Sequence, residues 1–147
     1  NKNTGGKNMK SKKFGNKWVI RIDKGEEIVQ TLKNFCQGNK IKLGIINGIG
    51  AVNKATIGLF DTKAKEYHSQ ELIGDYEITN LSGNISSMNK EAYLHLHITL
   101  ADENQHAYGG HLSSAIISGT GEILIEEIEG EIEREFNKEV GLNLLFG

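Results

Sequence analysis

The sequence predicts an α/β fold of the α+β kind: a bent, largely antiparallel sheet of about seven or more strands with one main helix. Two observations predict it. A single amphipathic helical pattern occurs early in the chain, and after residue 41 the apolar residues follow the two-residue period of strands. The 147 residues fit one domain with its own core, and 18 glycines without any proline supply the bends.

The first 16 residues, rich in Asn, Gly and Lys, predict a disordered basic arm before a single domain over residues 17–147. Six of the first 17 residues are lysines and none is acidic, which leaves 11 of the 17 basic side chains and all 19 acidic ones in the rest of the chain. The arm is interpreted as a solvated start or as a nucleic-acid-binding segment. An acidic body repels phosphate, which favours the solvated interpretation.

The helical pattern follows a first strand at residues 17–23. Asp23 and Glu26 have the spacing of a capping box, and residues 38–39 (Gly-Asn) end the helix. The apolar stripe of the helix consists of Ile28, Leu32, Phe35 and Cys36. Cys36, the only cysteine, is expected to be a buried structural thiol, and a lone cysteine excludes an internal disulfide.

Further strand patterns occupy most of the remaining chain. They lie at residues 41–46, 55–60, 66–72, 76–85, 93–100, 107–125, 131–136 and 142–145. Asn47-Gly48-Ile49-Gly50 is interpreted as a glycine turn between two strands. A dinucleotide-binding loop would need a third glycine, where Asn53 stands, and a helix after it.

Nothing in the sequence predicts a membrane segment. No run approaches the roughly 20 apolar residues that span a bilayer, and the start lacks the order of a signal peptide. With a single cysteine, a cytoplasmic location is expected.

Four of the five histidines lie within residues 93–112. His95 and His97 are two positions apart on one strand, so their side chains share a face, about 7 Å apart. A three-residue loop over residues 103–105, begun by Asp102, places His111 opposite His97, whereas a two-residue loop would place it on the other face. The same parity excludes His106 from the cluster.

Three neutral imidazoles on one face suit Zn²⁺ or another divalent first-row metal. Such a site at His95, His97 and His111 keeps a fourth ligand position open for water, a carboxylate or a neighbouring subunit. Gly109 and Gly110 leave room beside the rings for an ion, a ligand or another backbone. Structural histidines bonded to backbone and to each other are the alternative, and spacing alone does not choose between the two.

The chain resembles the PPC (plants and prokaryotes conserved) domain family over about residues 15–146. The motifs that carry the resemblance are Leu94-His95-Leu96-His97, Ala101-Asp102-Glu103 and Gly109-Gly110-His111-Leu112, supported by residues 21–26, 48–50, 60–61, 81–86 and 141–142. The resemblance implies a bent antiparallel sheet with one main helix, assembly as a homotrimer, and metal binding by His95, His97 and His111, as in some prokaryotic members.

In plant relatives the domain follows AT-hooks and associates with itself and with other proteins. The hook has an Arg-Gly-Arg-Pro core, and this chain has no proline and only two arginines. At the plant interaction motif, residues 74–79 carry Asp75 in place of an arginine, so recognition through a basic side chain does not carry over.

Three functions follow as hypotheses. The first is a homotrimeric regulatory or small-molecule-binding module with a metal, zinc above all. The second is a metal-dependent hydrolase-type enzyme, for which Asp102 and Glu103 are the nearby candidates for a general base. The third is a DNA-associated protein that uses the lysine arm.

Overall fold

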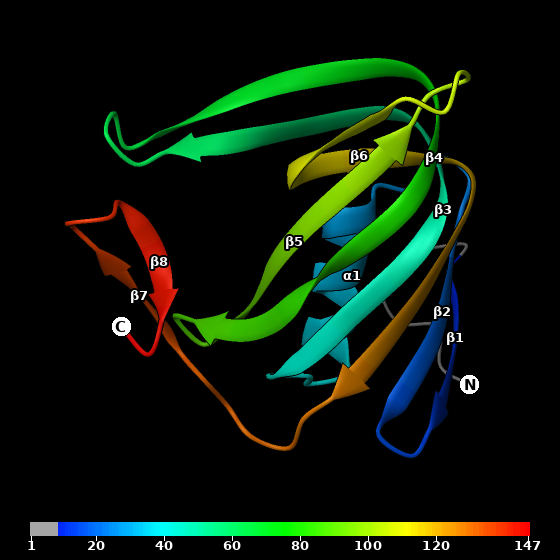
Figure 1. Cartoon of the computed structure of the whole chain (residues 1–147). Coiled ribbons are helices and arrows are strands. Elements are labelled where there is room, and N and C mark those ends of the chain that lie inside the picture. Colours follow the sequence, from blue (N-terminus) through cyan, green and yellow to red (C-terminus); the bar gives the residue numbers. More distant parts are fainter. Residues whose placement is uncertain (1–8) are drawn as a thin grey trace.

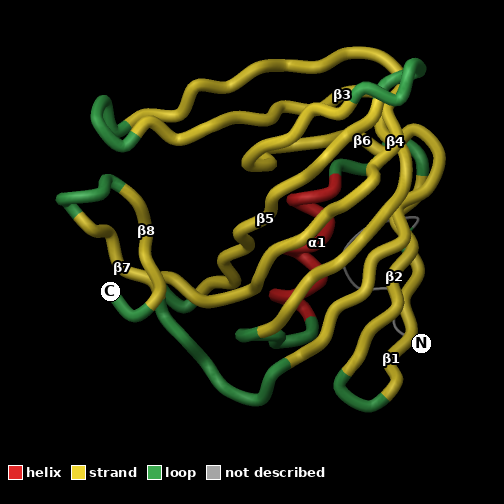
Figure 2. Tube along the Cα trace, in the orientation of Figure 1, coloured by secondary structure: helices red, strands yellow, loops and turns green. Residues whose placement is uncertain are grey.

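The computed structural model describes residues 9–147 (Figures 1 and 2). Its elements follow in the order β1 (Lys10–Phe14), β2 (Lys17–Asp23), α1 (Ile28–Gly38), β3 (Gly44–Asp61), β4 (Glu66–Met88), β5 (Glu91–Ala101), β6 (Ala107–Glu127), β7 (Arg134–Asn137) and β8 (Leu142–Leu145). The predicted fold class is confirmed, with eight strands and one helix among the described residues.

Six strands form one antiparallel sheet in the order β1-β2-β6-β3-β4-β5, and β7 pairs with β8 in a separate hairpin. The first part of β6 also pairs with β5, so the sheet closes on itself through β3, β4, β5 and β6. The strands curve strongly, with α1 against one side of the bend and β7–β8 beyond the other (Figure 1).

Helix α1 buries the predicted stripe. Ile28, Leu32, Phe35 and Cys36 are each 0% exposed, and burial raises the pKa of the Cys36 thiol to about 12, with a smaller contribution from Glu127. The N-cap is Glu27, whose carboxylate accepts hydrogen bonds from the backbone N–H groups of Val29 and Gln30. The same carboxylate accepts the N–H of Ala115 in β6 at 2.9 Å, which ties the helix start to the sheet.

The predicted capping box is therefore only half correct. Glu26 does accept the backbone N–H of Asp23 at 3.0 Å, but the helix begins at Ile28 and its cap is Glu27. Helix α1 is the only helix among residues 9–147, and it is neither long nor apolar enough to cross a bilayer.

The prediction of disorder over residues 1–16 is wrong for β1. Lys10–Phe14 pairs with β2 along its whole length, and Met9 before it is fully buried. Lysines are common on edge strands, where they discourage pairing with other chains, so a lysine-rich segment need not be a disordered arm. Residues 1–8 lie outside the described residues.

The predicted turn at Asn47–Gly50 is also wrong, because β3 runs unbroken through it for 18 residues. The register with β4 shifts between Gly48 and Gly50, which marks a bulge. Gly50 has φ +153°, and a Cβ there would collide with the carbonyl oxygen of Thr120. The glycines thus bend a continuous strand, and residues 66–72 and 76–85 likewise join in one strand, β4.

Gly83 in β4 provides a test of how tightly β4 and β5 pack. A Cβ at Gly83 would collide with the carbonyl oxygen of His95 and lie 2.9 Å from the Leu96 Cα. Gly83→Ala should therefore lower the free energy of unfolding by about 1–3 kcal/mol, measured by urea denaturation. Gly119→Ala is the matched control, because the nearest atom to its Cβ is 3.8 Å away. Equal effects of the two substitutions would contradict this account.

Candidate metal site

The hairpin between β5 and β6 has the predicted three-residue loop. Asp102 and His106 pair through a backbone hydrogen bond of 3.0 Å, which leaves residues 103–105 as the loop. The Asp102 carboxylate accepts the N–H groups of Asn104 and His106, both at 2.9 Å, so it is the turn acceptor. Gln105 takes φ +62°, the left-handed conformation that a glycine would adopt at less cost.

This loop sets the register of the histidines. His97 lies directly opposite His111, and His95 is two residues along on the same face. The ring centroids are 5.0 Å apart for His95 and His97, 5.6 Å for His95 and His111, and 5.9 Å for His97 and His111. The candidate ligand nitrogens all lie within 4.8 Å of one another, so the three histidines could hold a metal ion.

The two other histidines lie outside this cluster, as predicted for His106. The His106 ring is exposed, with Nδ1 3.9 Å from the Asp102 carboxylate. His68 is exposed as well, and its Nε2 lies 3.3 Å from the Asp61 carboxylate.

The ring nitrogens of the three clustered histidines have no hydrogen-bond partner among residues 9–147. His95 and His111 are half-buried and His97 is exposed, so their ring nitrogens reach solvent and are accessible to an ion. A tetrahedral zinc site with Zn–N of about 2.0–2.1 Å needs its nitrogens ~3.3 Å apart, so small side-chain rotations would complete it. The unmatched nitrogens fit an ion.

Burial favours the neutral form of the His95 and His111 imidazoles. Burial lowers the pKa of His95 to about 4, helped by the charges of His97, Arg134 and His111. Burial also lowers the pKa of His111, and His97 adds to the shift. A neutral imidazole has a lone pair for a metal, so these side chains are in the binding form at neutral pH.

Gly109 and Gly110, beside the rings, allow neighbouring backbone to approach closely. A Cβ on Gly110 would lie 2.6 Å from the carbonyl oxygen of Gly58 in β3, and one on Gly109 3.2 Å from that of Ile98. The sequence left open whether these glycines make room for an ion, a ligand or another backbone. In the structure the space beside them is taken by the backbone of neighbouring strands. This close approach lets β5, β6 and β3 meet where His111 is held.

The histidines lie at one wall of a cavity of about 380 Å³. The long β3–β4 hairpin, on the left of Figure 1 above β7–β8, contributes Phe60 and Tyr67, and the Tyr67 ring lies 4.8 Å from the His111 ring. The β7–β8 hairpin contributes Arg134, Leu142 and other residues. Lys65 Nζ donates to the Lys138 carbonyl at 2.6 Å, so the two hairpin turns are in contact.

The contribution of β7–β8 was not foreseen from the sequence. Arg134 is 7% exposed and donates to Ser86 Oγ, Asn84 Oδ1 and the Asn143 carbonyl. Its one sequence signal is that it is one of two arginines and lies in a strand of alternating charged and apolar residues. Neither Asp102 nor Glu103, the candidate bases, lines the cavity.

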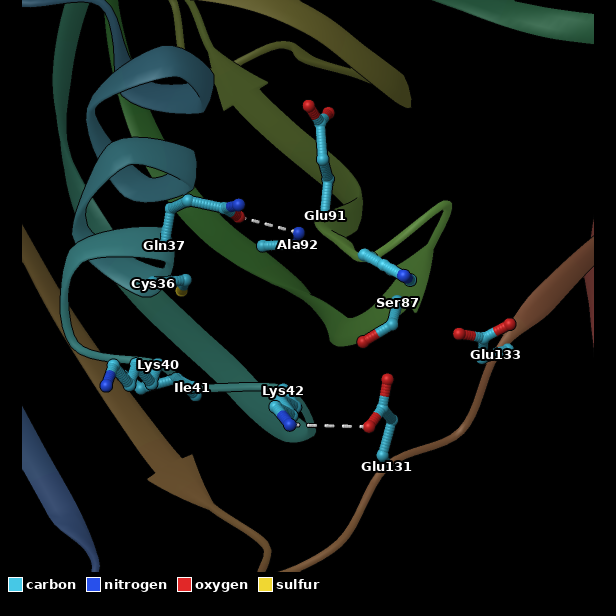
Figure 3. Close-up of a pocket in the computed structure, with 11 residues that line it drawn as sticks. Cys36, Gln37, Lys40, Ile41, Lys42, Ser87, Glu91, Ala92, Glu131 and Glu133 are labelled. Atoms are coloured by element: carbon cyan, nitrogen blue, oxygen red, sulfur yellow. Dashed lines mark hydrogen bonds and ion pairs between the residues drawn. The ribbon is translucent and has the colours of Figure 1, made fainter.

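A second, larger cavity of about 460 Å³ lies at the C-terminal end of α1 (Figure 3). Three lysines and three glutamates line it, and Lys42 forms an ion pair with Glu131 at 3.5 Å. The Gln37 side chain accepts the N–H of Ala92 at 2.7 Å. The three lysines and three glutamates balance one another in formal charge.

The fold and the histidine cluster agree with the family comparison. The chain belongs to the Plants and Prokaryotes Conserved (PCC) domain family, whose model matches residues 9–129. This confirms the resemblance to the PPC family, and the match begins before residue 17 and so takes in β1.

Two solved structures are similar over nearly the whole chain. A candidate DNA-binding protein from Bacteroides thetaiotaomicron is 44% identical, with a TM-score of 0.91 and coverage of 93% of this chain and 96% of that one. A metal-containing protein from Archaeoglobus fulgidus is 34% identical, with a TM-score of 0.85 and coverage of 92% and 96%.

The chain is also 28% identical over 112 residues to the bifunctional protein GlmU of a Synechococcus strain. That match covers 75% of this chain but only 16% of the relative, so the chain corresponds to a small part of the larger protein.

The strained loop residue gives a prediction. Gln105→Gly should raise the free energy of unfolding by roughly 0.5–1 kcal/mol, because glycine adopts positive φ without steric cost. Urea denaturation measures the change. Gln105→Ala keeps the conformational cost and should give no gain, so equal stabilisation by both substitutions would show that φ is not the cause.

Proposed function

We propose that this chain forms a homotrimeric metal-binding module with a regulatory or ligand-binding role, in which His95, His97 and His111 hold Zn²⁺. The observation that carries the proposal is the convergence of three imidazoles whose ring nitrogens have no other partner among residues 9–147. The archaeal relative described as metal-containing supports it. A cytoplasmic location goes with the proposal, since Cys36 is a lone buried thiol.

The donor set favours zinc over harder cations. Three nitrogen ligands without a carboxylate suit Zn²⁺ or a similar first-row ion, whereas Mg²⁺ and Ca²⁺ take oxygen ligands. Zinc held by three histidines offers one further position, to water or an anion. Because His97 is exposed and the cavity is open, a ligand has access to that position.

A hydrolase-type function is less well supported. A metal-dependent hydrolase needs a general base near the metal. Among residues 9–147 no Asp or Glu lines the histidine cavity. The Asp102 carboxylate instead accepts the N–H groups of the loop, which favours binding over catalysis.

A DNA-associated function has a specific but weaker basis. The Bacteroides relative is described as a candidate DNA-binding protein, and β1 carries Lys10, Lys12 and Lys13. However, Lys13 lies 3.9 Å from the Glu127 carboxylate, and Glu122 and Glu126 pair with β2 nearby. These acids oppose a phosphate backbone, so the lysines of β1 do not form a purely basic surface.

The trimer in the proposal has a candidate interface on the sheet. Apolar side chains, each 43–55% exposed, share one face of β2, β6 and β3. They are Val19, Ile45, Ile49 and Leu124. Glu122 and Glu126 share this face, opposite Ile49 and Ile45. Exposed apolar side chains grouped on one face are typical of a protein–protein interface, and further copies of this chain are the proposed occupants.

Metal uptake tests the site. Protein purified without a metal-affinity step should bind one Zn²⁺ per chain, measured by elemental analysis and by competition with a fluorescent chelator. His97→Ala removes a ligand and should weaken Zn²⁺ binding by more than the roughly 10–100-fold typical of losing a supporting group around a metal. His106→Ala, in the same hairpin but outside the cluster, is the control. Wild-type protein that takes up no Zn²⁺ would refute the proposal.

Light scattering after size-exclusion chromatography tests the assembly. Wild-type protein should have a mass about three times the 16.2 kDa of one chain. Ile49→Glu adds a charge to the apolar patch and should reduce the mass. Phe136→Glu, at a residue 59% exposed in the separate β7–β8 hairpin, should leave it unchanged. A wild-type mass of one chain would contradict the trimer.

A further inference from the structure

Arg134 is a buried cation in the wall of the histidine cavity. Its Nε donates to Ser86 Oγ at 2.7 Å, and its two terminal nitrogens donate to Asn84 Oδ1 and the Asn143 carbonyl at 2.9 Å. All three acceptors are neutral oxygens. The guanidinium carbon lies 4.8 Å from the centre of the Tyr93 ring.

Within the described part of the chain, this guanidinium forms no ion pair. Among residues 9–147 no carboxylate comes within 4.0 Å of it, whereas the other arginine, Arg21, lies 2.7 Å from the Asp23 carboxylate. No Asp or Glu among the described residues lines the cavity. Arginine stays charged in proteins, and a buried charge without an opposite charge is costly.

The structural contacts of Arg134 leave its charge without an opposite charge. Arg134 connects β7 to β4 and β8 through three neutral acceptors and lies over the Tyr93 ring, and none of these partners is an anion. The guanidinium has five N–H groups, of which three are used, so two remain for a further acceptor. A planar pair of donors matches a carboxylate, which it can bind through two parallel hydrogen bonds.

The rest of the cavity defines the ligand. Apolar side chains line it beside Arg134 and the histidines: Leu59, Phe60, Leu142 and Leu144. Its volume of about 380 Å³ is at the small end of ligand pockets, which run roughly 300–1,000 Å³. No lysine among residues 9–147 lines the cavity, so Arg134 is the one cationic side chain there within the described chain, which suits a monoanion with an apolar body better than a phosphate.

We infer that the histidine cavity binds a small aliphatic carboxylate, with Arg134 as the residue that selects the anionic group. The inference rests on the proposed function for its second anchor, the open ligand position of the zinc ion. The carboxylate meets Arg134 and the metal at one end, and its hydrocarbon part packs on the apolar walls.

The test uses zinc-loaded protein and isothermal titration calorimetry with butyrate, its uncharged analogue butyramide, and inorganic phosphate. Wild-type protein should bind butyrate at least tenfold more tightly than either of the other two. Arg134→Gln keeps hydrogen-bond donors but removes the charge, and it should weaken butyrate binding at least tenfold while Zn²⁺ uptake stays unchanged. Arg21→Gln alters the exposed, already paired arginine and is the matched control.

Three results would overturn the inference: no butyrate binding by wild-type protein, equal affinity for butyramide, or tighter binding of phosphate. If Arg134→Gln does not fold, the inference is tested by the butyrate affinity of Arg134→Lys and by the preference of the wild-type protein for butyrate over butyramide and phosphate. The experiments distinguish failure of the zinc-site proposal from failure of the carboxylate inference. Protein that takes up no Zn²⁺ but binds butyrate in an Arg134-dependent way refutes the metal proposal and supports this one.

Discussion

The structure depends on one strand, β6, which exchanges backbone hydrogen bonds with three others. Its later part lies between β2 and β3, its first part pairs with β5, and His111 pairs with both β3 and β5. Such a change of partner requires the strand to bend, and register shifts with β3 mark the bends. At the corner, Gly110 lets the Gly58 carbonyl approach. Because His111 follows directly, the sheet closure that completes the fold also positions the third imidazole.

Much of this site could be predicted from the sequence because its constraints are local. Side chains alternate along a strand, so His95 and His97 had to share a face, and the length of one turn decided the side of His111. Asp102 supplied the turn signal, and the structure confirms the pairing of His97 with His111. Helix α1 was predictable for the same reason, since four apolar residues at helical spacing define a stripe.

The errors arise where distant contacts override local patterns. The lysines of β1 indicate solvent, yet pairing with β2 makes that segment an edge strand. The glycines at Gly48 and Gly50 indicate a turn, yet pairing on both sides keeps β3 extended through them. The cavity wall formed by β7–β8 has no signal in the spacing of the histidines, because Arg134 reaches β4 across 48 residues of chain.

Two departures from the ordinary rules of folding coincide in this molecule. Buried polar groups normally find partners and buried charges normally find opposite charges. Here the rings of three histidines, two half-buried and one exposed, have no protein partner among residues 9–147, and one buried guanidinium has no counter-ion there; all of them line one cavity. Outside it, the other arginine, Arg21, forms an ion pair with Asp23, and three lysines form ion pairs with glutamates. Because sequences that fold well keep such exceptions to functional sites, the coincidence favours one site that needs a cation at the histidines and an anion beside Arg134.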